Sequence, residues 1–147
     1  MPITFDSENI DFPDLNKRKT AAWIKKVAST YNNIVGEIAY IFCNDEKILE
    51  INREFLKHDF YTDIISFDYS EGEIISGDIF ISLDTVRSNS QKYTSDYREE
   101  LYRVIIHGVL HLCGFNDNSE EESTAMRNAE DQALMLLNKM HLGNSYL

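Results

Sequence analysis

Residues 96–117 are DYREELYRVIIHGVLHLCGFND, the strongest helical segment of the sequence. Asp96 and Glu99 resemble a capping box, in which two side chains satisfy backbone N–H groups at the start of a helix. Gly114 is suited to end the helix, because glycine tolerates the left-handed conformation after a last turn. The apolar bulk comes from Leu101, Val104, Ile105, Val109 and Leu112. We therefore expect one long helix over residues 96–113.

Helical and strand-like patterns alternate along the rest of the chain. We expect helices over residues 16–31, 45–57, 84–93 and 120–139. We expect strands over residues 3–5, 37–43, 63–69 and 78–83. Asp84 is the expected cap of the third of these helices, and Gly77 is expected to start the last strand. The mixed order favours the α+β class, with a single-domain mixed sheet of about four strands flanked by helices over residues 1–147.

The composition indicates a globular protein with a hydrophobic core and an acidic balance of charge. The 147 residues are 43% hydrophobic, and 25 acids against 14 Lys and Arg give a formal net charge of -11. Phosphate contacts require Lys or Arg, so this charge disfavours broad binding to RNA or DNA but leaves a local basic patch open. Five basic residues fall between Lys17 and Lys26, where we expect a solvated helix face rather than a binding patch.

The sequence has no feature of secretion or of a membrane span. No basic region followed by an apolar run lies at its start, and no apolar run approaches the roughly 18 residues of a span. Cys43 and Cys113 each lie among apolar residues, which predicts buried thiols in a reducing compartment. We therefore expect a cytoplasmic protein without a membrane partner.

Two histidines of the long helix are candidate metal ligands. His107 and His111 are four residues apart, so they lie on one helix face and can reach one cation at about 2.0–2.1 Å. Gly114 lets the chain turn back, and Asp117 could supply a third ligand. Three protein ligands leave one position for water, as in catalytic zinc sites. The alternative is a pair of hydrogen-bonded histidines without a metal. Gly114 and the nearby Asp117 favour the metal site over this alternative.

Gly108 separates this arrangement from the zinc peptidases. In their HExxH motif a glutamate follows the first histidine and serves as general base. A peptidase mechanism would lack that base here. A mid-helix glycine also costs about 1 kcal/mol relative to alanine. Something must offset this cost, such as the close approach of another backbone.

Three blocks of sequence, HGVLHLCG at residues 107–114, YTDIISF at 61–67 and GDI at 77–79, share a family resemblance. They are similar to the motifs HGxLHLxGYDH, PTDVLSFP and GDI of the YbeY family of metal-dependent endoribonucleases. The first block is the most specific, and the spacing of all three extends the resemblance over about residues 37–139. The resemblance implies a sheet flanked by helices and a zincin-like site on the long helix. It also implies cleavage of single-stranded RNA in small-subunit rRNA 3′-end maturation and in ribosome quality control.

The chain departs from the family pattern at two positions. Asp117 stands where the family has its third histidine, a zinc ligand, so the resemblance implies a retained site with a changed affinity or metal preference. A functional arginine ahead of the PTD block corresponds to Leu56 here. The neighbouring Lys57, or Arg53 one helical turn earlier, would have to supply that positive charge.

These observations lead to the hypothesis of an endoribonuclease with one zinc ion per chain, bound by His107, His111 and Asp117. A zinc-activated water would attack the phosphodiester, and a nearby cation would offset the charge on phosphorus. The candidate catalytic residues are Lys57, Arg53 and Asp63, with Glu100 as a second candidate for the general base. Expected partners are rRNA and ribosome or small-subunit proteins, and no DNA. The alternatives are a ribosome-assembly factor with a mainly structural metal and a metal-dependent hydrolase of another substrate.

Overall fold

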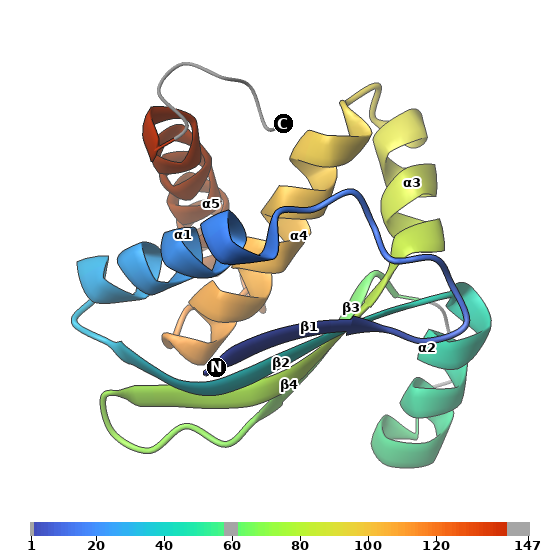
Figure 1. The fold of residues 1–147 in the computed structure, drawn as a ribbon, viewed down its shortest axis with the longest axis horizontal. Coiled ribbons are helices and arrows are strands. Elements are labelled where there is room, and N and C mark those ends of the chain that lie inside the picture. The colour runs from blue at the N-terminus through green and yellow to red at the C-terminus, as the bar shows by residue number, and fades with distance from the viewer. Residues whose placement is uncertain (1, 58–61, 141–147) are drawn as a thin grey trace.

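The computed structural model describes residues 2–57 and 62–140. In this part of the chain the strands are β1 (Ile3–Ser7), β2 (Ile34–Cys43), β3 (Ile64–Asp68) and β4 (Ile74–Ser82). The helices are α1 (Lys17–Thr30), α2 (Asp45–Ile51) with its π-helical continuation η1 (Asn52–Leu56), α3 (Leu83–Lys92), α4 (Tyr97–Leu112) and α5 (Glu120–Met140). The predicted α+β class with a four-stranded mixed sheet is confirmed (Figure 1).

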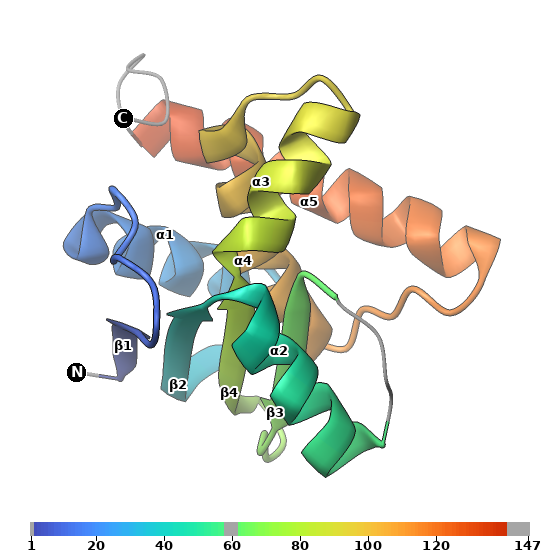
Figure 2. The same ribbon diagram turned by 90° about the vertical axis from the view of Figure 1, so that its right-hand side faces the viewer.

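The sheet has the strand order β1-β2-β4-β3. β2 runs parallel to both β1 and β4, whereas β3 pairs antiparallel with β4. α1 connects the parallel strands β1 and β2, as a crossover helix does. Figure 2 shows α1, α4 and α5 over one face of the sheet and α2 against the other. β3 is last in the strand order and is therefore an edge strand.

α4 is the centre of the main hydrophobic core. Its buried side chains include Leu101, Ile105, Ile106, Val109 and Leu110. The hydroxyl of Tyr40 in β2 donates a hydrogen bond to the carbonyl oxygen of Ile105 at 2.8 Å. The indole N–H of Trp23 in α1 donates to the carbonyl oxygen of Ala133 in α5, also at 2.8 Å. These bonds join the sheet and two helices around α4, so the helix with the candidate ligands is held from several sides.

One predicted detail near the sheet was wrong. Gly77 lies inside β4 rather than at its start, because pairing with β2 extends the strand back to Ile74. The neighbours of Gly108 are side chains rather than another backbone. A Cβ at Gly108 would lie 3.0 Å from Ile79 Cδ1 and 3.1 Å from Ile64 Cδ1. The glycine thus lets α4 pack closely on β3 and β4.

We expect Gly77→Ala to lower the free energy of unfolding by about 1–3 kcal/mol, the usual cost of overpacking. The added Cβ would lie 2.5 Å from the backbone oxygen of Phe67 in the paired strand β3. Gly108→Ala is the matched control. The atoms nearest to its Cβ would be isoleucine methyl groups rather than backbone, and alanine gains about 1 kcal/mol in a helix. Urea unfolding measures both variants, and wild-type stability of Gly77→Ala would refute the expectation.

The ends of two helices also differ from prediction. Ser82, not Asp84, caps α3: its hydroxyl accepts a hydrogen bond from the Thr85 N–H at 3.3 Å. Asp84 lies in the first turn and accepts from the Asp45 N–H instead. The helix expected over residues 45–57 ends its α-helical part at Ile51 and continues as a π-helix.

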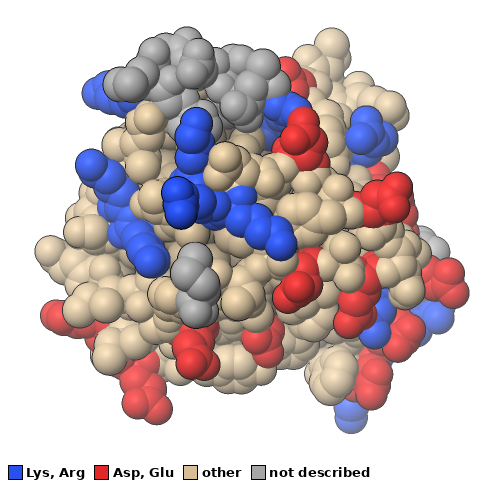
Figure 3. All heavy atoms as spheres, viewed as in Figure 1, with Lys and Arg blue, Asp and Glu red and all other residues tan. Residues whose placement is uncertain are grey.

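The basic residues of α1 lie on the surface, as predicted for a solvated helix face. Lys and Arg side chains gather over α1 in Figure 3, while acids occupy the lower edge and the right of the same view. All five side chains are exposed: Lys17, Arg18, Lys19, Lys25 and Lys26. Within the described ranges, none of the helices has the length and apolarity needed to cross a membrane.

Candidate functional site

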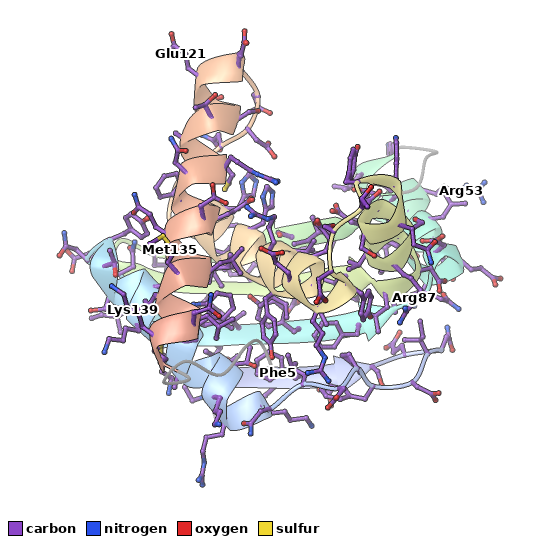
Figure 4. All side chains as sticks on the ribbon, turned by 90° about the horizontal axis from the view of Figure 1, so that it is seen from above. Phe5, Arg53, Arg87, Glu121, Met135 and Lys139 are labelled. Carbon is purple, nitrogen blue, oxygen red and sulfur yellow. The ribbon has the colours of Figure 1, made fainter. Side chains whose placement is uncertain are left out.

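A cleft of about 520 Å³ lies between β3, α4 and α5. Most of the residues singled out from the sequence line it, namely Asp63, Glu100, His107, His111 and Asp117. α5 adds residues that were not expected there, namely Ser123, Met126, Arg127 and Glu130. Residues far apart in the chain thus meet in one concave site. In Figure 4 this region is seen from above, with α5 on the left.

The end of α4 places the histidines and turns the chain back. The rings of His107 and His111 are nearly parallel, with centroids 6.2 Å apart. Gly114 has a φ of 104° and its N–H donates to the His111 carbonyl, while the Phe115 N–H donates to the Leu110 carbonyl. These two bonds form a Schellman motif, which ends the helix. The returning chain brings Asp117 Oδ2 to 3.5 Å from His107 Nε2.

Both histidines use their Nδ1 atoms for hydrogen bonds. His107 Nδ1 donates to Glu130 Oε2 at 2.7 Å, and His111 Nδ1 donates to the Phe115 carbonyl at 2.9 Å. A carbonyl oxygen only accepts, so Nδ1 of His111 has the proton. The lone pair of a neutral His111 is then on Nε2, the tautomer that a metal ligand needs. The donor set of two imidazoles and a carboxylate also suits zinc.

The three candidate ligands, His107, His111 and Asp117, do not surround one common metal position in this structure. Across residues 2–57 and 62–140, no three His, Cys, Asp or Glu side chains are close enough together to hold a metal ion. His111 and Asp117 are both exposed, so their side chains are free of tight packing. Because Asp117 Oδ2 is already 3.5 Å from His107 Nε2, metal binding would require only an adjustment of these surface side chains.

Glu130 links the histidine to a buried arginine. Its carboxylate is 5% exposed and binds His107 through Oε2 and Arg103 Nη1 through Oε1, the latter at 3.0 Å. Arg103 Nη2 also donates to Asp131 at 2.7 Å. The sequence analysis missed Glu130. The available signal was an acid on the apolar face of the last helix, four residues after Met126 and three before Ala133.

Burial shifts the pKa of the ionisable groups in the cleft. It raises the pKa of Asp63, although the charge of His107 acts in the opposite direction. It also raises the pKa of Glu100, against the charge of Arg103. Burial lowers the pKa of His107, but the hydrogen bond and charge of Glu130 outweigh it, so that this pKa is raised. Asp63 and Glu100 therefore remain candidates for proton transfer.

The tentative cations Lys57 and Arg53 are not among the described residues that line the cleft. Lys57 ends η1 in the left-handed conformation, and Arg53 borders a separate depression beside Glu50. Figure 4 shows Arg53 on the side of the molecule away from α5. The positive charges at the cleft come from Arg103 and Arg127. The chain thus has Leu56 at the position of the family arginine, while arginines of α4 and α5 bring positive charge to the cleft.

The cysteines lie outside this site. Burial raises the pKa of Cys43 to about 12 and that of Cys113 to about 11. Neither is among the described residues that line the cleft. The structure therefore favours a packing role for both thiols over a ligand or redox role.

Comparison with known proteins agrees with the motifs. The model of the family described as Endoribonuclease YbeY matches residues 3–138. The chain is 58% identical over 136 residues to Endoribonuclease YbeY of Bacteroides fragilis, covering 92% of this chain and 98% of the relative. It is 55% identical to that of Bacteroides thetaiotaomicron, covering 92% and 99%. A solution structure from Thermotoga maritima superposes with a TM-score of 0.68 at 20% identity, covering 98% of this chain and 94% of the other, which shows the shared fold.

Proposed function

Because the chain belongs to the YbeY family of endoribonucleases, we propose that it hydrolyses single-stranded RNA in rRNA processing at a zinc site. The family and its close relatives support the endoribonuclease role and a dependence on metal. Our proposal adds that His107, His111 and Asp117 hold one zinc ion per chain. The observation that supports it is the engagement of both Nδ1 atoms, which leaves Nε2 of each histidine for a metal.

A zinc ion held by these three residues would lower the pKa of water and offset negative charge on a phosphate oxygen. Asp63 lies in the same cleft and is the proposed general base, since burial raises the pKa of its carboxyl group toward the working range. Arg127 lines the cleft with an exposed side chain and is the proposed cation for the phosphate. Arg127 thus takes the role that the sequence analysis gave to Lys57 or Arg53, which are not among the described residues that line the cleft.

The lining of the cleft supports the proposed preference for single strands. The edge strand β3 and the residues before it form one wall, through Thr62, Asp63, Ile64 and Ser66. An extended, unpaired strand can lie along such a wall with its backbone near the histidines. We also propose rRNA and ribosome or small-subunit proteins as partners, and a cytoplasmic location. One domain over residues 1–147 is also part of the proposal.

Cleavage assays on one RNA, single-stranded or annealed to its complement, test this function. We expect chelator-treated protein to be inactive and added Zn²⁺ to restore cleavage of the single strand only. Asp63→Asn should retain the metal and reduce the cleavage rate by about 10²- to 10⁴-fold, the usual contribution of a general base. Bound metal with intact RNA under Zn²⁺, Mn²⁺ and Mg²⁺ would instead favour an assembly factor with a structural metal.

A further inference from the structure

The cleft continues beyond the histidines into a second cavity of about 480 Å³, which we call the α3–α4 cavity. α3 and α5 flank α4 in Figure 4, and the cavity lies toward the end of α3. The two cavities share four lining residues, Asp63, Glu100, Arg103 and Arg127. Four more residues line only the second, Asn89, Tyr93, Ser95 and Glu99. A strand bound in the cleft can therefore extend into the α3–α4 cavity without leaving the surface.

Tyr93 gives the α3–α4 cavity an exposed aromatic wall. Its side chain is 66% exposed at the C-terminal end of α3, whereas Tyr40 and Tyr102 are buried in the core. The ammonium group of Lys92 lies 5.4 Å from the centroid of the Tyr93 ring. Proteins that bind single-stranded nucleic acid combine such aromatic rings with nearby cations, because every base has a face that can stack.

The charges in the cavity fit a base better than a phosphate. Glu99 and Glu100 line it and are only partly exposed. Arg103 is neutralised by ion pairs with two acids of α5, which leaves Arg127 as the principal cation. Carboxylates repel phosphate but accept hydrogen bonds from the amino groups of cytosine, adenine and guanine. Acids in a first helical turn also stabilise the helix, so these carboxylates alone would not indicate a binding site. The cavity that they line and the exposed ring beside them do indicate one.

We propose that the α3–α4 cavity binds the nucleobase of a nucleotide next to the cleaved bond and prefers bases with an amino group over uracil. The inference rests on the proposed endoribonuclease function. Tyr93 stacks on the base, and the Glu99 carboxylate accepts a hydrogen bond from its amino group. Arg127, which lines both cavities, contacts the phosphate between them. Uracil has carbonyl oxygens in place of these amino groups. Its one ring N–H lies between two oxygens that the carboxylate repels, so it is the poorer partner for Glu99.

The test separates binding from cleavage. A short fluorescent all-uridine RNA is compared with three RNAs in which one internal uridine is cytidine, adenosine or guanosine. Affinities are measured by anisotropy with chelator present, and cleavage positions are mapped afterwards with metal. We expect the three substituted RNAs to bind about tenfold more tightly than all-uridine RNA. Tyr93→Ala should weaken binding of all four RNAs by about tenfold. Glu99→Gln should remove the difference between cytidine and uridine.

Two variants serve as matched controls. Tyr69→Ala removes a ring of similar exposure, 59%, that lines a different cavity. Glu121→Gln removes a charge at the tip of α5 (Figure 4). Equal affinity for the four RNAs, no binding at all, or equal effects of Tyr93→Ala and Tyr69→Ala would each overturn the inference. Base-selective binding without cleavage under any metal would refute only the proposed hydrolysis. Cleavage without base preference would refute only the proposed base-binding role of the α3–α4 cavity.

Discussion

His111→Ala should abolish stoichiometric metal binding while leaving the fold intact. The His111 side chain is exposed at the end of α4 and makes a hydrogen bond to the Phe115 carbonyl, so its removal affects little packing. Loss of a direct ligand should lower zinc affinity by more than the roughly 10- to 100-fold that loss of an outer-shell partner costs. Metal content after dialysis measures zinc binding, and thermal unfolding without metal measures whether the fold is intact.

Asp117→Ala tests the third ligand in the same experiment. The Asp117 carboxylate is 3.5 Å from His107 Nε2, and its side chain is 45% exposed. Asn116→Ala is the matched control, because Asn116 is an exposed neighbour without a carboxylate. Metal content should fall in Asp117→Ala and stay at the wild-type value in Asn116→Ala. Retention of one zinc ion by Asp117→Ala would exclude this aspartate as a ligand.

Local signals in the sequence predicted the helix of the site well. The helix expected over residues 96–113 is α4, from Tyr97 to Leu112, because its cap Asp96 and its stop Gly114 act within one turn of each end. β4 was less predictable. Its first residues pair with β2, some forty positions earlier in the chain, and no pattern within residues 74–77 shows this pairing. Contacts over long sequence separation decide such boundaries.

The same limit explains which site residues were found. His107, His111 and Asp117 lie within one local motif, so spacing alone relates them. Arg127 and Glu130 come from α5 and reach the cleft only because α5 packs on α4. Lys57 and Arg53 were chosen by proximity to Leu56 in the chain. The structure instead brings arginines into the cleft from other helices.

Glu130→Gln should weaken zinc binding by about 10- to 100-fold, although Glu130 is not a proposed ligand. The two carboxylate oxygens serve different partners, Oε1 for Arg103 and Oε2 for His107. A glutamine has one acceptor oxygen and cannot serve both. His107 would then lose the acceptor that orients its ring and keeps the proton on Nδ1. Competition with a chromophoric chelator measures the affinity, and Glu130→Asp tests whether a displaced carboxylate restores it in part.

Asp131→Asn is the control that separates this role from general stability. Asp131 binds the same guanidinium of Arg103 as Glu130 does, and its side chain is 51% exposed. This variant should keep wild-type zinc affinity and lose at most about 1 kcal/mol of stability. If both variants weaken zinc binding equally, the effect would come from Arg103 and the helix packing, and the specific role of Glu130 would be refuted.

The metal-free protein gives a second test of Glu130, through the pKa of His107. That pKa is raised in the folded protein, chiefly because the bond and charge of Glu130 outweigh burial. A raised folded pKa contributes stability that is fully present below the unfolded value of about 6.5 and is lost as pH rises through the folded value. The stability deficit of metal-free Glu130→Gln should therefore grow as pH falls from 8 toward 6. NMR titration should show a lower His107 pKa in Glu130→Gln and an unchanged one in Asp131→Asn. An unchanged pKa in Glu130→Gln would mean that Glu130 does not set the protonation of the histidine.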